Sequence, residues 1–260
     1  MYNIFVIKKL LTLLGILLLL GVGIVGAKTF VDRHREKELI PATPTETLDN
    51  ETAKISEQTT EPEKPNFNKT KLSNTDPASL WVVVNKKRPL NPLKYAPGDL
   101  ISVGNSQQMR SEAGAALALL INAAAKAGLS IQPLSGYRSY DKQVSVYNNE
   151  VNSYGQAVAD TESARPGHSE HQTGLSVDIG GGGCGIEDCF GNTAEGKWVA
   201  TNAHTYGFIV RYTAPKQAVT GYRAEPWHVR YVGTELSEEM HIQGASTLEE
   251  FFGLGAAPSY

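Results

Sequence analysis

Residues 169–178 have the sequence SEHQTGLSVD, and this stretch says more about the fold than any other. Its first half is polar and continues a loop-like region, whereas residues 174–179 alternate as a β-strand does. His171 belongs to the loop, and Asp178 lies near the end of the predicted strand. The chain can therefore fold back so that both side chains face one point, as the ligands of a metal ion do.

A second short motif, EPWH at residues 225–228, opens another predicted strand at residues 227–232. His228 would complete a set of three N and O ligands with His171 and Asp178, which a catalytic zinc needs beside one open position. Glu225 supplies a carboxylate that could act as the general base of metal-assisted hydrolysis. The spacing is not that of a standard zincin motif. On the residues alone, each histidine could equally be a surface or core residue, and the aspartate a turn residue.

The rest of the chain predicts helices mixed with short strands. Because the elements do not alternate as regular βαβ units, the predicted fold class is α+β. Further strands are expected at residues 81–85, 129–134 and 208–212, and helices at 107–127, 141–154, 193–206, 235–241 and 247–252.

The composition changes along the 260 residues and predicts three regions. Residues 1–28 contain an uncharged apolar run at 10–27, which is long enough for a membrane anchor and also compatible with a cleaved signal peptide. Residues 29–76 are poor in large apolar side chains and predict a disordered linker. Residues 77–260 remain for one folded domain. We expect a single-pass protein of the cell membrane with this domain outside the cytoplasm, or a secreted protein if the signal is cleaved.

Several residues have more than one interpretation. Cys184 and Cys189 could be thiolate ligands, but the histidine and aspartate set already suffices for a metal. In an exported protein a local disulfide between them is the better interpretation. Trp227 should point away from the neighbouring ligand and pack in the core, and His168 is either a contact near the metal or a polar loop residue. The net charge of −3 indicates no nucleic-acid partner.

Three runs in order, SGYRS at residues 135–139, SEHQTGLSVD and EPWH, resemble the VanY-type D-alanyl-D-alanine carboxypeptidases. These zinc peptidases are related to VanX and to lysostaphin-like enzymes, and the resemblance covers residues 81–252. It implies a single zinc peptidase domain with a small antiparallel sheet flanked by helices. His171, Asp178 and His228 would be the zinc ligands, and Glu225 the catalytic base.

The resemblance also assigns the substrate side of the site. Arg138 would stabilise the oxyanion or grip substrate, and Gln143 and Ser169 would line the substrate groove. The implied activity is zinc-dependent removal of a terminal D-amino acid, D-Ala above all, from peptidoglycan stem peptides. Two alternatives stay open: an endopeptidase with the same zinc site, and a silent domain that binds the cell wall.

Overall fold

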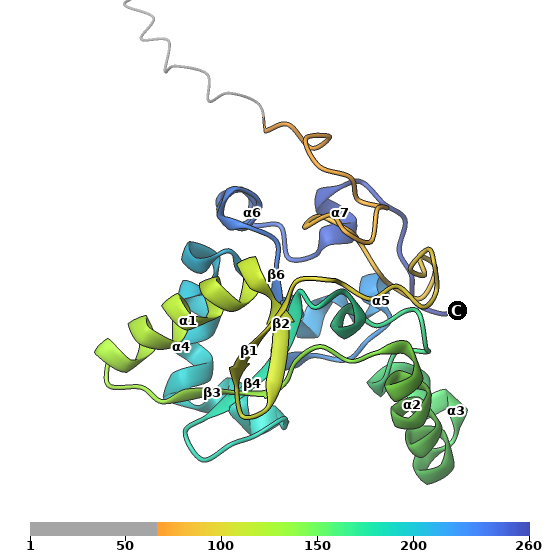
Figure 1. Ribbon diagram of the computed structural model, residues 1–260, viewed down its shortest axis with the longest axis horizontal. Helices are drawn as coiled ribbons and strands as arrows, with labels where there is room; N and C mark the ends of the chain where they lie inside the picture. Colours follow the sequence, from red (N-terminus) through yellow and green to blue (C-terminus); the bar gives the residue numbers. More distant parts are fainter. Residues whose placement is uncertain (1–66) are drawn as a thin grey trace, which may run out of the picture. The chain divides into compact units, whose positions relative to one another are not determined.

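An antiparallel sheet of four strands lies at the centre of the domain (Figure 1). The computed structural model describes residues 67–260. In spatial order the strands are β3 (Ile131–Ser135), β4 (Ser176–Gly181), β6 (Glu225–Tyr231) and β5 (Phe208–Tyr212). Each neighbouring pair is antiparallel. The predicted α+β fold with a small antiparallel sheet flanked by helices is therefore confirmed.

A two-stranded hairpin and the helices surround this sheet. The hairpin consists of β1 (Leu100–Gly104) and β2 (Gln107–Arg110). The α-helices are α1 (Ser111–Lys126), α2 (Tyr140–Tyr154), α3 (Gln156–Glu162), α4 (Ala194–Asn202), α5 (Gln217–Thr220), α6 (Thr234–Gln243) and α7 (Leu248–Phe251). Short 3-10 helices are η2 (Glu170–Thr173), η3 (Asp188–Asn192), η4 (Ala203–Tyr206) and η5 (Ala214–Lys216).

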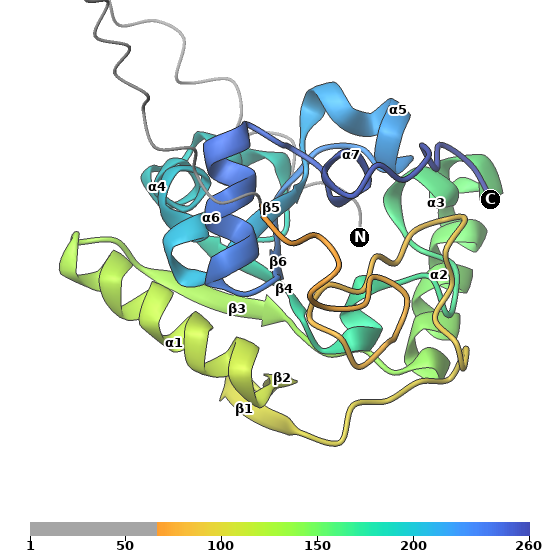
Figure 2. The ribbon, with the colours of Figure 1, turned by 90° about the horizontal axis from the view of Figure 1, so that it is seen from above.

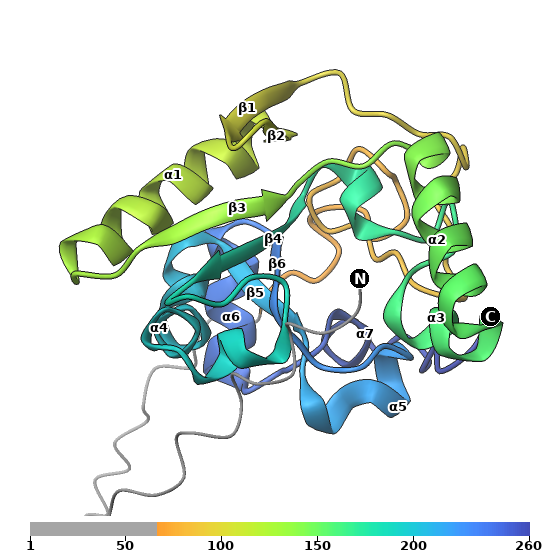
Figure 3. The same ribbon diagram turned by 90° about the horizontal axis from the view of Figure 1, so that it is seen from below.

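The two faces of the sheet carry different side chains, because successive residues of a strand point to opposite sides. Val177 and Val229, a register pair of β4 and β6, face the apolar core. Leu117 of α1 belongs to the same core, and α1 runs beside β3 in two views (Figures 2 and 3). The neighbouring register pair, Asp178 and His228, faces the other way. The alternation thus places polar side chains together on one face.

Local signals explain where two helices begin and end. Ser139 caps α2, because its side chain accepts a hydrogen bond from the backbone N–H of Lys142. Gly155 follows the last residue of α2 with a φ of 80°, a conformation that favours glycine. Thr193 caps α4 in the same way by accepting from the N–H of Gly196. The predicted helix at residues 141–154 is confirmed, and it begins one residue earlier.

Two predicted elements are wrong. Residues 81–85 form no strand of a sheet, although their side chains are buried. The carbonyl of Val82 instead accepts a hydrogen bond from the buried Arg230 guanidinium, which replaces a ladder partner. Residues 107–110 are β2 and not the start of the predicted helix, because they pair with β1 and the helix begins only at Ser111.

The folded domain also begins earlier than predicted. The ring of Phe67 lies 5.4 Å from that of Trp81 and 5.5 Å from that of Phe251. The carbonyl of Asn74 accepts a hydrogen bond from the N–H of Val83. The prediction of a disordered linker is therefore wrong for residues 67–76, which this aromatic packing and hydrogen bonding hold on the domain.

The predicted anchor and most of the predicted linker lie outside the described residues. Within residues 67–260, none of the helices combines the length and apolarity that crossing a membrane requires.

Candidate metal centre

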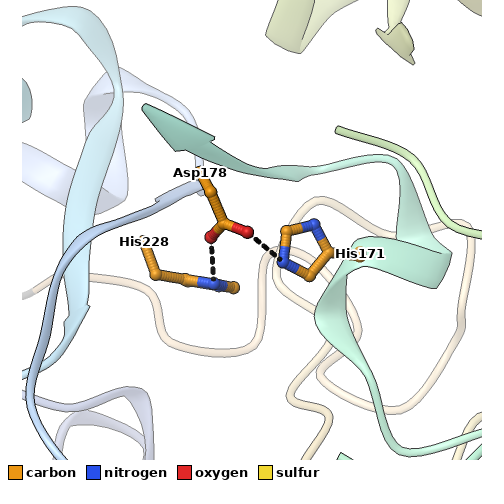
Figure 4. A group of neighbouring side chains, drawn as sticks. All are labelled: His171, Asp178 and His228. Carbon is orange, nitrogen blue, oxygen red and sulfur yellow. Dashed lines mark ion pairs between the residues drawn. The ribbon is translucent and has the colours of Figure 1, made fainter. Parts of the chain in front are cut away.

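Strands β4 and β6 bring two of the predicted metal ligands together. Asp178 is the direct register partner of His228, so both side chains leave the same face of the sheet. His171 comes from η2, which ends at Thr173 and is followed by Gly174 in the left-handed region with a φ of 71°. This turn leads into β4, the strand that carries Asp178. Figure 4 shows the three side chains converging from these elements.

The ligand atoms of the three residues lie within 4.8 Å of one another, and all three side chains are buried. Asp178 Oδ2 lies 3.3 Å from His171 Nε2, and Asp178 Oδ1 lies 3.1 Å from His228 Nδ1. Despite this closeness, Oδ1 makes no hydrogen bond within the described part of the chain. A buried carboxylate oxygen without a hydrogen bond is costly. Together with two imidazole nitrogens, it fits a zinc ion with three protein ligands.

The orientation of His171 is set by a hydrogen bond on its other nitrogen. His171 Nδ1 lies 2.9 Å from the carbonyl oxygen of Gly136 and donates to it, which leaves Nε2 free as a ligand. Gly136 packs closely in turn, since a Cβ there would lie 2.4 Å from the carbonyl oxygen of Gln108. The backbone at residue 136 therefore fixes the ring of a candidate metal ligand.

Glu225 stands at the start of β6 beside this group. Its Oε2 lies 3.7 Å from His228 Nδ1, and its side chain is 12% exposed. In the metal-free protein, burial raises the pKa of Glu225 to about 8, although the charge of His228 opposes the shift. A carboxylate with a pKa near neutrality is suited to take and return a proton.

Arg138 approaches the same group from the segment after β3. Its Nη2 lies 3.9 Å from Asp178 Oδ2. Two hydrogen bonds fix the guanidinium in place: Nη2 donates to Ser135 Oγ and Nη1 donates to Gln143 Oε1, both at 2.9 Å. The structure thus places a fixed cation next to the candidate metal ligands.

The two predicted substrate contacts occupy different positions. Ser169 is buried and lines the cavity that contains the metal ligands. Gln143 is fully buried and also donates to the carbonyl oxygen of Ala164 at 2.7 Å. Gln143 therefore lies behind Arg138 as its support, which differs from the predicted position on the wall of the groove.

The outer wall of the cavity contains residues that the sequence did not single out. Glu150 of α2 and Glu162 of α3 line it. Arg223 lines it as well, and donates to Glu162 at 2.5 Å and to Asp188 at 2.7 Å. Tyr212, at the end of β5, has its ring centroid 5.0 Å from that of His228. These residues come from four separate segments, and no local motif marks them.

The remaining candidates make structural contacts. Cys184 and Cys189 form a disulfide. His168 is engaged structurally, since its Nδ1 lies 2.8 Å from the carbonyl oxygen of Asn85 and its ring packs edge-on against Tyr260. Trp227 is buried in the apolar core and also lines part of the cavity.

An α+β domain with a buried His/Asp/His group, a neighbouring carboxylate and a fixed arginine defines a metallopeptidase of the three-ligand type. The profile of the VanY family, D-alanyl-D-alanine carboxypeptidases, matches residues 106–234. The chain belongs to this family of metallo-carboxypeptidases.

Three relatives illustrate the similarity. The protein YodJ of Bacillus subtilis (strain 168) is 42% identical over 188 residues, which is 68% of each chain. The solved structure of the LdcB LD-carboxypeptidase is 41% identical with a TM-score of 0.63, and the match covers 68% of this chain and 87% of that one. A variant of the vancomycin resistance D,D-pentapeptidase VanY, solved in complex with Zn(II), is 34% identical with a TM-score of 0.59 and coverages of 66% and 98%.

Proposed function

We propose that this domain is a zinc carboxypeptidase that releases one terminal D-amino acid, D-Ala, from peptidoglycan stem peptides. The observation that carries the proposal is the convergence of Glu225 and Arg138 on the His171, Asp178 and His228 group within one cavity. Amide hydrolysis needs a base for water and a stabiliser for the oxyanion, and these two residues supply both.

The roles follow from the positions of the side chains. A zinc ion held by the three ligands supplies Lewis-acid activation of water and of the scissile carbonyl. Glu225 accepts the proton of the attacking water and delivers it to the leaving amine. Arg138 stabilises the developing oxyanion or holds the substrate carboxylate, because Ser135 and Gln143 fix its guanidinium toward the centre.

The bond that is cleaved has two candidates. The resemblance to the VanY-type enzymes implies D,D-specificity, in which D-Ala leaves a stem that ends in D-Ala-D-Ala. The second candidate is an L,D-carboxypeptidase that removes D-Ala from a tetrapeptide. The relatives support both candidates, because the LdcB LD-carboxypeptidase is 41% identical and a D-alanyl-D-alanine carboxypeptidase of Enterococcus faecium is 40% identical over 134 residues. Both candidates use the same metal centre.

The deciding experiment incubates the purified zinc-loaded protein with a stem tetrapeptide and a stem pentapeptide, with and without a chelator. Chelator-sensitive loss of one D-Ala from the tetrapeptide alone supports the L,D-specificity, and loss from the pentapeptide alone supports the D,D-specificity. Products are identified by mass. Internal cleavage would contradict the carboxypeptidase proposal in favour of an endopeptidase, and bound zinc without any product would favour a silent wall-binding domain.

We further propose that the domain works outside the cytoplasm, tethered to the membrane by residues 10–27. The support is the apolar, uncharged composition of that run and the disulfide between Cys184 and Cys189. Fractionation of cells with a protease-accessibility assay tests this location. A domain found only in the cytosol would contradict it.

A further inference from the structure

Glu170, the residue before the first histidine ligand, carries a fully buried carboxylate that touches one of the metal ligands. Its Oε1 accepts from Arg211 Nε at 2.8 Å and from Arg230 Nη1 at 2.9 Å. Its Oε2 accepts from Ser176 Oγ at 3.2 Å and lies 3.4 Å from His228 Nε2. Oε1 therefore accepts from two arginines, whereas Oε2 accepts from one serine and lies next to a buried ring nitrogen that makes no hydrogen bond within residues 67–260.

The two arginines are themselves held in place. Arg211 donates through Nη1 and Nη2 to the two carboxylate oxygens of Glu249, at 2.9 and 2.8 Å, and Glu249 accepts from Asn85 Nδ2 at 2.9 Å. Arg230 donates to the carbonyl oxygen of Val82 at 2.9 Å. The side chains of Glu170, Glu249 and both arginines are fully buried. Such a network keeps the Glu170 carboxylate in one orientation.

The two nitrogens of His228 face different partners. Nδ1 faces Asp178 and Glu225, at 3.1 and 3.7 Å, and so points to the candidate metal position. Nε2 points the opposite way, to Glu170 Oε2. A neutral imidazole carries its hydrogen on one nitrogen only. With hydrogen on Nε2, the ring presents a donor to the carboxylate 3.4 Å away and keeps the Nδ1 lone pair for the metal.

We propose that Glu170 is a positioning residue that holds His228 as the tautomer with hydrogen on Nε2, so that Nδ1 binds zinc. The proposal rests on the zinc site of the proposed function. It makes no use of the substrate, because Glu170 acts through the ligand ring. Partners of this kind affect metal affinity by about 10–100-fold.

Replacement of Glu170 by glutamine gives a sharp test because the two oxygens differ. The Oε1 position receives two arginine donors, so the glutamine carbonyl must stay there. Its NH2 group then takes the place of Oε2 and presents a donor to His228 Nε2. This arrangement favours the other tautomer of His228, whose Nδ1 carries hydrogen and cannot bind zinc.

Glu249→Gln is the matched control. Glu249 belongs to the same buried network through Arg211, and its side-chain hydrogen bonds are with Arg211 and Asn85, not with a candidate metal ligand. Both variants remove one buried negative charge and should lose comparable stability. We expect Glu170→Gln to weaken zinc binding about 10–100-fold, measured by competition with a chromophoric chelator, and Glu249→Gln to leave it unchanged. An equal loss of zinc affinity in both variants, or no loss of zinc affinity in either, would overturn the proposal.

A second measurement needs no variant and covers the case in which Glu170→Gln does not fold. Long-range proton–nitrogen NMR of the zinc-loaded wild-type protein identifies the nitrogen of His228 that carries hydrogen. Hydrogen on Nε2 supports the proposal, and hydrogen on Nδ1 with zinc on Nε2 refutes it. A protein that binds zinc with this tautomer but hydrolyses no stem peptide would refute the proposed function and leave the role of Glu170 intact.

Discussion

In the metal-free domain, the buried carboxyl group of Glu225 should lower the free energy of unfolding at neutral pH. The variant Glu225→Gln should show how large this loss of stability is. Burial raises the pKa of the carboxyl from its ordinary value of 4.5 to about 8. The folded protein therefore keeps this proton up to about pH 8, whereas the unfolded chain releases it near pH 4.5. Stability from this group falls as the pH rises through that window. At pH 7 the difference amounts to about 3 kcal/mol.

The glutamine side chain does not titrate, so the stability of the variant should not fall between pH 4.5 and pH 8 through this position. We expect metal-free Glu225→Gln to be more stable than wild type at pH 7 by up to about 3 kcal/mol, and the gap to vanish near pH 4. Its turnover should fall about 10²–10⁴-fold because the proposed general base is gone. Zinc should still bind, since Glu225 lies outside the ligand group. A functional residue that costs stability is a common trade-off.

The assay is urea unfolding of chelator-treated protein, followed by circular dichroism between pH 4 and pH 8. Glu150→Gln is the control, because Glu150 lines the outer wall of the same cavity and is only partly buried. It should change the free energy of unfolding little at any of these pH values. The reasoning is refuted if Glu225→Gln is no more stable than wild type at pH 7, or if it retains full activity.

Three further predictions concern the supports of the centre. In the metal-free protein burial lowers the pKa of His228, but the neighbouring carboxylates of Asp178 and Glu170 outweigh this and raise the pKa to about 9. Zinc affinity, titrated against a chelator, should therefore rise with pH up to about 9. A pH-independent affinity would count against this. Cys184→Ser should cost about 2 kcal/mol in urea unfolding, from the short loop that the disulfide closes; an unchanged midpoint would contradict the estimate. Gly136→Ala should lower both zinc affinity and melting temperature. Its Cβ would lie 2.4 Å from the carbonyl oxygen of Gln108, so the backbone would shift and displace the Gly136 carbonyl that orients His171. Normal zinc binding would refute this.

Local patterns predicted much of the secondary structure. The helix at 141–154 and the strand at 208–212 are present with boundaries within one residue, because their caps, glycine stop and β-branched residues lie close together in sequence. Residues 81–85 are predicted as a strand because their β-branched composition suits one, but they form no strand of a sheet. The group that donates to the carbonyl of Val82 is the Arg230 guanidinium, which lies 148 positions away in the chain. No local sequence pattern contains both residues.

The sequence by itself determined the class of the fold, the metal ligands worth testing and the neighbouring carboxylate, since histidine, aspartate and glutamate carry their chemistry with them. Only the tertiary structure decided how these groups are held. The β4–β6 register puts Asp178 opposite His228, and the buried network aims Glu170 at the far side of the same ring. The physical reason is that a hydrogen bond depends on the distance and direction between two atoms. Residues far apart in the chain acquire both only when the domain has packed.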